Sequence, residues 1–339
     1  MPKGSDYQYI KAYSINDAID ALHQYGPQAV LFAGGTDLLI QIRQQAVEPL
    51  CLIDVKGIQE LREITHDGNF VKIGAATTLR EVQKSSVVDS VFPVLTETAR
   101  HVGSIQLRNR ATVGGNLCQS VKCPYYNQSH INSFMRQAIK PCFKRGGKLC
   151  HTARWGSEVS HSIITGSNSC RASFGSNIAV TLAALQGLVV LVNRDGSREV
   201  SIDRFYMENG EPDIACHEII THIKIPLSNR NTGVFLQYKA NPASYTLLNI
   251  AVSLTLEDDG KTCKTSRVWL GGVAAQPYEC DTVQQYLGGR RLTEELIAKV
   301  SGSLFEHIVV SEPPLTFKVA RVRVLCREAL LKLIGLNKK

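Results

Sequence analysis

Two glycine-containing loops constrain the fold of this chain more than any other feature of its sequence. The first, AGGTD at 33–37, stands between the apolar segment AVLF and the helical pattern LLIQIR. The second, SIQLRNRATVGGN at 104–116, again combines glycines with polar side chains. Glycines at the start of a helix expose backbone N–H groups and let a pyrophosphate approach closely. Two such loops on separate segments can clamp one dinucleotide between two subdomains, although each alone is also compatible with an ordinary turn.

Length, charge and hydropathy exclude several classes of protein. The chain of 339 residues is long enough for two or three domains, and neither loop has the G-x-G-x-x-G pattern of a Rossmann nicotinamide site. The net charge is +8, but the basic residues are scattered, so we do not expect nucleic-acid binding. We also expect no membrane span and, because the first residues lack the apolar core of a signal peptide, a cytoplasmic protein.

Hydrophobic periodicity divides the chain into two differently built parts, with a boundary near residue 228. Before it, helical patterns alternate with short apolar strands, and we expect helices over 14–26 and 79–88. The segment 116–170 is irregular and rich in Cys, Ser, Asn and Gly. After the boundary we expect antiparallel strands, a hairpin turn at 258–261, and helices from LTEELIAKV onward.

The ordered motifs resemble one protein family. The segments VLFAGGTDLL, VKIGAATTL and SIQLRNRATVGGNLCQ resemble, in that order, three motifs of the FAD-binding subunit of the xanthine dehydrogenase family of molybdenum hydroxylases. FLQYKA, NIAVSLTL and VWLGGVAAQPYE resemble the C-terminal flavoprotein domain of that family. The resemblance therefore covers almost the whole chain.

The resemblance implies an α+β fold with a defined order of domains. A two-subdomain FAD-binding fold of the PCMH/VAO type would come first, with subdomain 1 over 1–57 and subdomain 2 over 58–228. Subdomain 2 would contain a Cys-rich iron–sulfur loop at about 117–172. A CO-dehydrogenase-flavoprotein-like C-terminal domain, an antiparallel sheet plus helices, would occupy 229–339.

The resemblance also implies which residues contact FAD. The pyrophosphate contacts of the family fall on Phe32, Ala33, Gly34, Gly35, Thr36, Asp37 and Leu38. The remaining contacts fall on Thr112, Gly115, Asn116, Cys118, Asn177, Ile220 and Lys239, with Cys118 near the flavin. One position departs from the family, which usually has Ser-Asp where this chain has Ser176-Asn177. Asparagine keeps the hydrogen-bonding capacity but lacks the charge, so this contact is in doubt.

Five of the ten cysteines fall between Cys118 and Cys170. In a cytoplasmic protein, clustered cysteines indicate metal ligands or redox groups before disulfides. Cys123, Cys142, Cys150 and Cys170 are separated by 18, 7 and 19 residues. This spacing matches neither the C-x₂-C pairs of most structural zinc sites nor a bacterial ferredoxin run. Spacing alone leaves a metal cluster and ordinary buried thiols both open.

A subset of the family makes the metal interpretation more specific. That subset includes the 4-hydroxybenzoyl-CoA reductase β subunit and some bacterial aldehyde oxidoreductases, and carries a 4Fe–4S loop after the GGN motif. CPYYNQS at 123–129, CFKRGGKLC at 142–150 and the cysteine at 170 resemble that loop. The resemblance implies a 4Fe–4S cluster on the four thiolates, with zinc on the same thiolates as the alternative. Nearby Lys144, Arg145 and Lys148 would offset the negative charge of the cluster.

The implied function is electron transfer within a heteromeric complex. The partners would be a large subunit with a molybdenum cofactor and a small subunit with two 2Fe–2S clusters, in a dimer of heterotrimers. This chain would pass electrons between those clusters, FAD and an external carrier, ferredoxin or NAD. We find no catalytic acid–base set in the sequence. The alternatives are a stand-alone NAD(P)H-dependent flavin oxidoreductase and a non-enzymatic protein with a Cys₄ zinc site.

Overall fold

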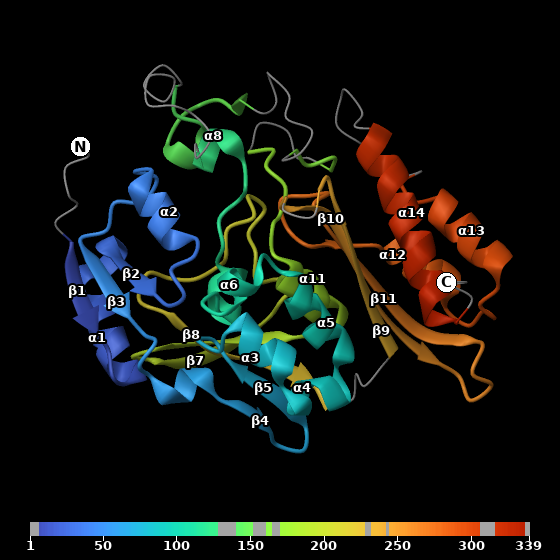
Figure 1. Cartoon of the computed structure of the whole chain (residues 1–339), viewed down its shortest axis with the longest axis horizontal. Helices are drawn as coiled ribbons and strands as arrows, with labels where there is room; N and C mark the ends of the chain where they lie inside the picture. The colour runs from blue at the N-terminus through green and yellow to red at the C-terminus, as the bar shows by residue number, and fades with distance from the viewer. Residues whose placement is uncertain are drawn as a thin grey trace.

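The computed structural model describes residues 7–127, 140–151, 161–164, 170–227, 232–241, 244–305 and 316–335. The described chain forms three β-sheets flanked by helices (Figure 1). None of the helices in these ranges is both long and apolar enough to cross a bilayer.

The first sheet is parallel and leads directly into the first glycine loop. Its strand order is β1 (Gln8–Lys11), β3 (Cys51–Asp54), β2 (Ala29–Phe32), and α1 (Ile15–Tyr25) packs against it. Ser14 and Asp17 form a reciprocal capping box at the start of α1, which confirms the predicted helix. The short helices η1 (Gly26–Gln28) and α2 (Leu38–Arg43) flank β2 in the chain.

The second sheet is antiparallel and forms the floor of the molecule in Figure 1. Its strand order is β4 (Ile64–His66), β5 (Phe70–Gly74), β8 (Ile219–Pro226), β6 (Leu188–Asn193), β7 (Gly196–Ser201). The described helices that lie between β3 and β6 in the chain are η2 (Gln59–Arg62), α3 (Leu79–Lys84), α4 (Ser86–Val91), α5 (Pro93–His101), α6 (Ile105–Arg108), α7 (Val113–Leu117), α8 (Pro124–Asn127), η3 (Phe143–Arg145) and α11 (Asn177–Ala184).

The third sheet carries helices on both faces. Its strand order is β12 (Tyr278–Glu279), β11 (Cys263–Gly271), β10 (Thr246–Leu256), β9 (Thr232–Lys239), all antiparallel. Ala251 and Trp269 join the core around α5 and α11, whereas Ile250 and Leu270 join the core of the C-terminal helices. Those helices are α12 (Asp281–Leu287), α13 (Glu294–Gly302) and α14 (Thr316–Leu333). Burial on both faces explains why β10 is a nearly continuous apolar run.

Most predicted elements are confirmed, with one correction. The helix expected over 79–88 is two helices, because Ser85 is extended and its hydroxyl accepts a hydrogen bond from the N–H of Val88 to cap α4. The hairpin turn at 258–261 is confirmed, with the Asp259 carboxylate accepting from the N–H groups that follow it. The predicted boundary near 228 lies outside the described residues, as does the end of the CPYYNQS segment.

Gly272, just after β11, provides a test of the third sheet. Its φ is +83°, and an added Cβ would lie 2.0 Å from the carbonyl oxygen of Leu247. Gly272→Ala should therefore lower the free energy of unfolding by about 2 kcal/mol or more in urea denaturation. Gly302→Ala, where an added Cβ meets nothing within 4 Å, should change it by less than about 1 kcal/mol. Equal stability of the two variants would contradict this packing.

Candidate functional site

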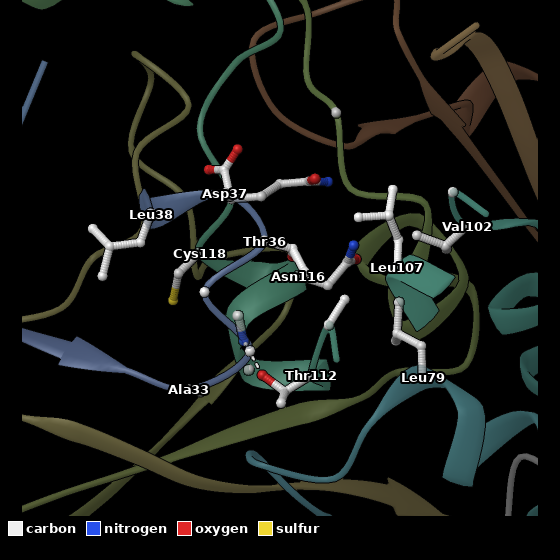
Figure 2. A pocket seen from close by; sticks show the side chains of 18 of the residues that line it. Ala33, Thr36, Asp37, Leu38, Leu79, Val102, Leu107, Thr112, Asn116 and Cys118 are labelled. Atoms are coloured by element: carbon white, nitrogen blue, oxygen red, sulfur yellow. Dashed lines mark hydrogen bonds between the residues drawn. The ribbon is translucent and has the colours of Figure 1, made fainter. Parts of the chain in front are cut away.

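A cavity of about 790 Å³ receives residues from all three sheet regions. It lies within the volume range of small-molecule and cofactor pockets. Its walls come from the first glycine loop, the second glycine loop with the segment before it, the start of α11, the end of β9 and the turn before β10. Figure 2 shows the two glycine loops meeting at this cavity. The structure therefore brings the two loops together, as the sequence predicted.

The first loop touches the second through backbone atoms. An added Cβ on Gly34 would lie 2.1 Å from the carbonyl oxygen of Arg110, so only glycine fits there. Gly35 has φ +71°, and the ring of Phe32 lies beneath it. The loop is thus held between a main-chain segment on one side and an aromatic ring on the other.

The second loop ends in the capped start of α7. The Thr112 hydroxyl accepts a hydrogen bond from the N–H of Gly115 at 3.1 Å, drawn as a dashed line in Figure 2. Gly114 lies against Ala75, where an added Cβ would be 3.0 Å from the carbonyl oxygen. The Asn116 side chain accepts a 2.8 Å bond from the Ser176 hydroxyl, which joins this loop to α11.

All the residues predicted to contact the cofactor line this cavity except Phe32. Phe32 lies below the loop, with the Lys56 ammonium 3.7 Å from its ring centroid and Tyr9 edge-on at 6.5 Å. Its position supports the loop rather than the cavity wall. The contacts of the other residues with a ligand remain predictions.

The amide of Asn177, the position that departs from the family, is fully engaged with the third sheet. Its Oδ1 accepts a 2.8 Å bond from Asn249, and its Nδ2 donates to Thr246 at 3.2 Å and to Gln237 at 3.4 Å. A carboxylate has no N–H to donate to the last two partners. Asparagine is therefore suited to joining the start of α11 to β9 and β10.

Asp37 is a half-buried carboxylate at the cavity wall. Its Oδ2 accepts from the backbone N–H and the hydroxyl of Ser120, at 2.8 and 2.9 Å, and from Gln41 at 2.9 Å. Its Oδ1 pairs with the Lys122 ammonium at 2.5 Å. Burial raises the pKa of this carboxyl, but the charge of Lys122 and these hydrogen bonds outweigh it and lower the pKa below its ordinary value.

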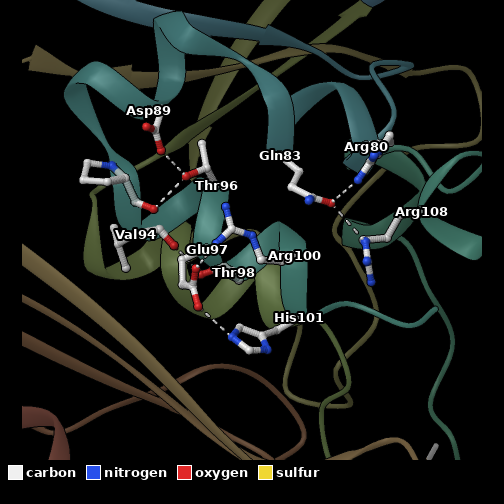
Figure 3. A network of polar contacts seen from close by, with 11 residues as sticks. Arg80, Gln83, Asp89, Val94, Thr96, Glu97, Thr98, Arg100, His101 and Arg108 are labelled. Carbon is white, nitrogen blue, oxygen red and sulfur yellow. Dashed lines mark hydrogen bonds and ion pairs between the residues drawn. The ribbon is translucent and has the colours of Figure 1, made fainter. Parts of the chain in front are cut away.

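Arg108 and Lys239 place two positive charges on another part of the cavity wall, and the sequence analysis identified only Lys239. Arg108 is buried and donates to the carbonyls of Val102 and Gly103 at 3.1 and 3.0 Å. It also donates to the Gln83 side chain at 3.2 Å (Figure 3). Burial and the charges of two nearby arginines lower its pKa. Burial and the charge of Arg108 likewise lower the pKa of Lys239, which the resemblance did identify. The only available signal for Arg108 was its place inside the second loop motif.

Cys118 faces the cavity with an uncharged thiol. Its side chain is accessible because the cavity opens onto it, yet protein surrounds it closely enough for lost solvation to raise its pKa to about 12. Cys118 is therefore a small apolar wall residue at neutral pH rather than a thiolate.

The four cysteines predicted as metal ligands lie close together in two pairs. Cys150 hydrogen-bonds to Cys170, which with burial raises the pKa of Cys170. Burial and the nearby Cys123 raise the pKa of Cys142. Cys170 lies at the edge of a small apolar cluster that contains Cys123, which connects the two pairs. Within the described ranges no three His, Cys, Asp or Glu side chains are arranged to hold a metal ion, so the metal site stays a prediction.

Residues 161–164, between the third and fourth of these cysteines, are anchored to the turn after β11 and to α14. The N–H groups of Ile163 and Ile164 donate to the carbonyl of Val273. The buried Lys318 ammonium of α14 donates to the carbonyl oxygens of His161 at 2.6 Å and Gly272 at 2.9 Å. Burial lowers the pKa of Lys318 to about 8.

Comparison with known families identifies the class of this fold. Residues 5–228 match the FAD binding domain in molybdopterin dehydrogenase, and residues 234–333 match the CO dehydrogenase flavoprotein C-terminal domain. These matches confirm the predicted fold, an FAD-binding domain followed by a flavoprotein C-terminal domain. The chain belongs to the FAD-binding medium subunits of the molybdenum hydroxylase and CO dehydrogenase family.

Curated relatives of the chain are oxidoreductase subunits. It is 28% identical to the aldehyde oxidoreductase FAD-binding subunit PaoB of Escherichia coli K12, over 80% of this chain and 84% of that subunit. It is 23% identical to the carbon monoxide dehydrogenase medium chain of Hydrogenophaga pseudoflava, over 91% and 88%. Its fold is also that of a chain of quinoline 2-oxidoreductase from Pseudomonas putida 86, with TM-score 0.75, 20% identity and 98% of both chains covered.

The raised pKa of Cys118 predicts slow, strongly pH-dependent alkylation. In protein stripped of FAD, iodoacetamide should label Cys118 slowly at pH 8 and about tenfold faster per pH unit up to about pH 12, because only the thiolate reacts. Bound FAD should block the reaction. Exposed Cys216 serves as the internal control in peptide mass spectrometry. Labelling of Cys118 as fast as Cys216 at pH 8 would contradict this environment.

Proposed function

We propose that this chain is the electron-transfer subunit of a molybdenum hydroxylase complex, with FAD in the cavity between the two glycine loops. The observation that carries the proposal is the meeting of both loops at one cavity of about 790 Å³. Relatives named as FAD-binding subunits of an aldehyde oxidoreductase and a xanthine dehydrogenase support it.

The residues of the cavity fit FAD. Gly34 and Gly35 line the cavity with backbone alone, because an added Cβ would collide with the carbonyl of Arg110 or the ring of Phe32, and Thr112 caps the second helix start. Arg108 and Lys239 supply positive charge, which suits the anionic phosphates of FAD. When bound, FAD exchanges two electrons with one partner and single electrons with another.

We further propose a 4Fe–4S cluster on Cys123, Cys142, Cys150 and Cys170. Two pairs of thiols linked through the apolar cluster around Cys123, with the charge of Lys144 acting on Cys170, suit a thiolate-ligated cluster. Each thiolate of a cubane binds a different iron, so the ligand sulfurs surround a body larger than one ion. Two separate pairs of cysteines agree better with this than with four thiolates at about 2.3 Å from one zinc ion.

The proposed partners are a molybdenum-cofactor large subunit and a small subunit with two 2Fe–2S clusters, assembled as two heterotrimers. The external carrier is ferredoxin or NAD. The names of the relatives, which include medium chains of glyceraldehyde and carbon monoxide dehydrogenases, support an assembly of several subunits. If reduced ferredoxin cannot reduce the FAD of the intact complex, the ferredoxin route is wrong.

Iron content tests the cluster. The chain, co-expressed with its partners and purified without oxygen, should contain FAD and about four iron atoms in this subunit. Cys142→Ser should lose the iron and its broad visible absorption, because one ligand is missing. Cys216→Ser removes an exposed cysteine outside the set and should keep both.

The other outcomes separate the alternatives. Stoichiometric zinc in place of iron would identify the Cys₄ zinc site and overturn the cluster. Turnover of NAD(P)H by the isolated chain would favour the stand-alone flavin oxidoreductase. A colourless preparation from the intact complex would overturn the proposed function itself.

A further inference from the structure

The first glycine loop is tied to the segments that carry the cysteines. We call residues 118–127 and 140–151 the cysteine arm. Both oxygens of Asp37 receive donors from this arm, Oδ1 from Lys122 and Oδ2 from Ser120, across more than 80 residues of sequence. Gln41 is the one further donor described, and it belongs to α2 itself. The last residue before α2 is therefore fixed mainly from the cysteine arm.

The helix that follows this loop rests on the same arm. Tyr126 donates its hydroxyl to the Gln41 side chain at 3.0 Å. Arg145 donates to the carbonyl of Gln44 at 3.2 Å and to the carbonyl of Tyr126 at 2.8 Å, so it joins both described parts of the arm to the end of α2. These contacts act at the start, middle and end of α2.

Among the residues that the structure describes, little else holds α2. It has six residues, none of them buried, and no side chain caps its start. Helices this short are not stable by themselves in water, and without a buried face α2 gains little from the core. The position of α2, and with it the end of the glycine loop, therefore depends on the cysteine arm.

Lys122 also balances the charge of Asp37 at the cavity wall. Asp37 and Lys122 both line the cavity where FAD is proposed to bind. A pyrophosphate beside the glycine loop would bring more negative charge close to the Asp37 carboxylate. Lys122 supplies the opposite charge at 2.5 Å, which keeps the carboxylate paired when the anion binds. Removing Lys122 would leave two anionic groups facing each other.

We propose that the cysteine arm holds α2 and the first glycine loop in the FAD-binding conformation, with Lys122 as the central positioning residue. Lys122 directly precedes Cys123, so filling the cysteine site and binding FAD favour each other. By thermodynamic linkage, the factor by which iron tightens FAD binding equals the factor by which FAD tightens iron binding. This inference rests on the proposed function and adds to it a coupling between the two sites.

The first test measures FAD affinity in the complex. FAD is removed and titrated back, and the dissociation constant is read from flavin fluorescence. Lys122→Met should raise the dissociation constant about tenfold. The matched control, Lys140→Met, removes the same charge from an exposed site on the same arm and should leave it unchanged. Tyr126→Phe removes only the hydroxyl that reaches Gln41 and should raise the dissociation constant by about twofold to fivefold. This milder variant keeps the inference testable if Lys122→Met does not fold.

The second test removes iron with a chelator under reducing conditions. The wild-type FAD dissociation constant should then rise, and Lys122→Met should show a smaller rise because its link is already broken. If Lys122→Met and Tyr126→Phe both bind FAD like Lys140→Met, the inference is overturned while the proposed function stands. If the wild-type complex binds no FAD at all, the proposed function and the inference are overturned together.

Discussion

The backbone contact between the two glycine loops is the constraint on which the cavity depends. Gly34 lies against the main chain at Arg110 with no space for a side chain, and Gly114 packs against Ala75, where an added Cβ would lie 3.0 Å from the carbonyl oxygen. The first contact joins the loop after β2 to the segment that precedes α7. The second joins α7 to the turn after β5. Because main-chain atoms set the separation, the lining side chains can vary without changing the framework of the site.

Charge is arranged unevenly around that framework. On one part of the wall, Asp37 neutralises Lys122. On another, burial and the charge of Arg108 lower the pKa of Lys239, and the hydrogen bonds described for Arg108 go to uncharged acceptors. A dianionic ligand entering this cavity would meet unneutralised positive charge in one region and a closed ion pair in the other.

Local chemistry in the sequence predicted much of this structure, and long-range packing determined the rest. The helix that Ser14 caps and the two glycine loops depend on neighbouring residues, so pattern and spacing were sufficient. The capping role of Ser85 was equally local but was missed, because its flanks share a helical pattern. The side chain of Phe32, predicted among the pyrophosphate contacts, lies under the loop, a position that depends on packing against Gly35. The pairing of Asp37 with Lys122 spans 85 residues, and no local pattern indicates it.

Lys318 shows how the Cys-rich stretch fits into the rest of the protein. It is almost fully buried in α14, and one of its two carbonyl partners, that of His161, belongs to the Cys-rich stretch itself. A buried ammonium that loses an acceptor is strongly unfavourable. Displacing the carbonyl of residue 161 would leave this ammonium with the carbonyl of Gly272 as its one described acceptor. A change in the Cys-rich stretch is therefore transmitted, across 157 residues of sequence, to the packing of the last helix.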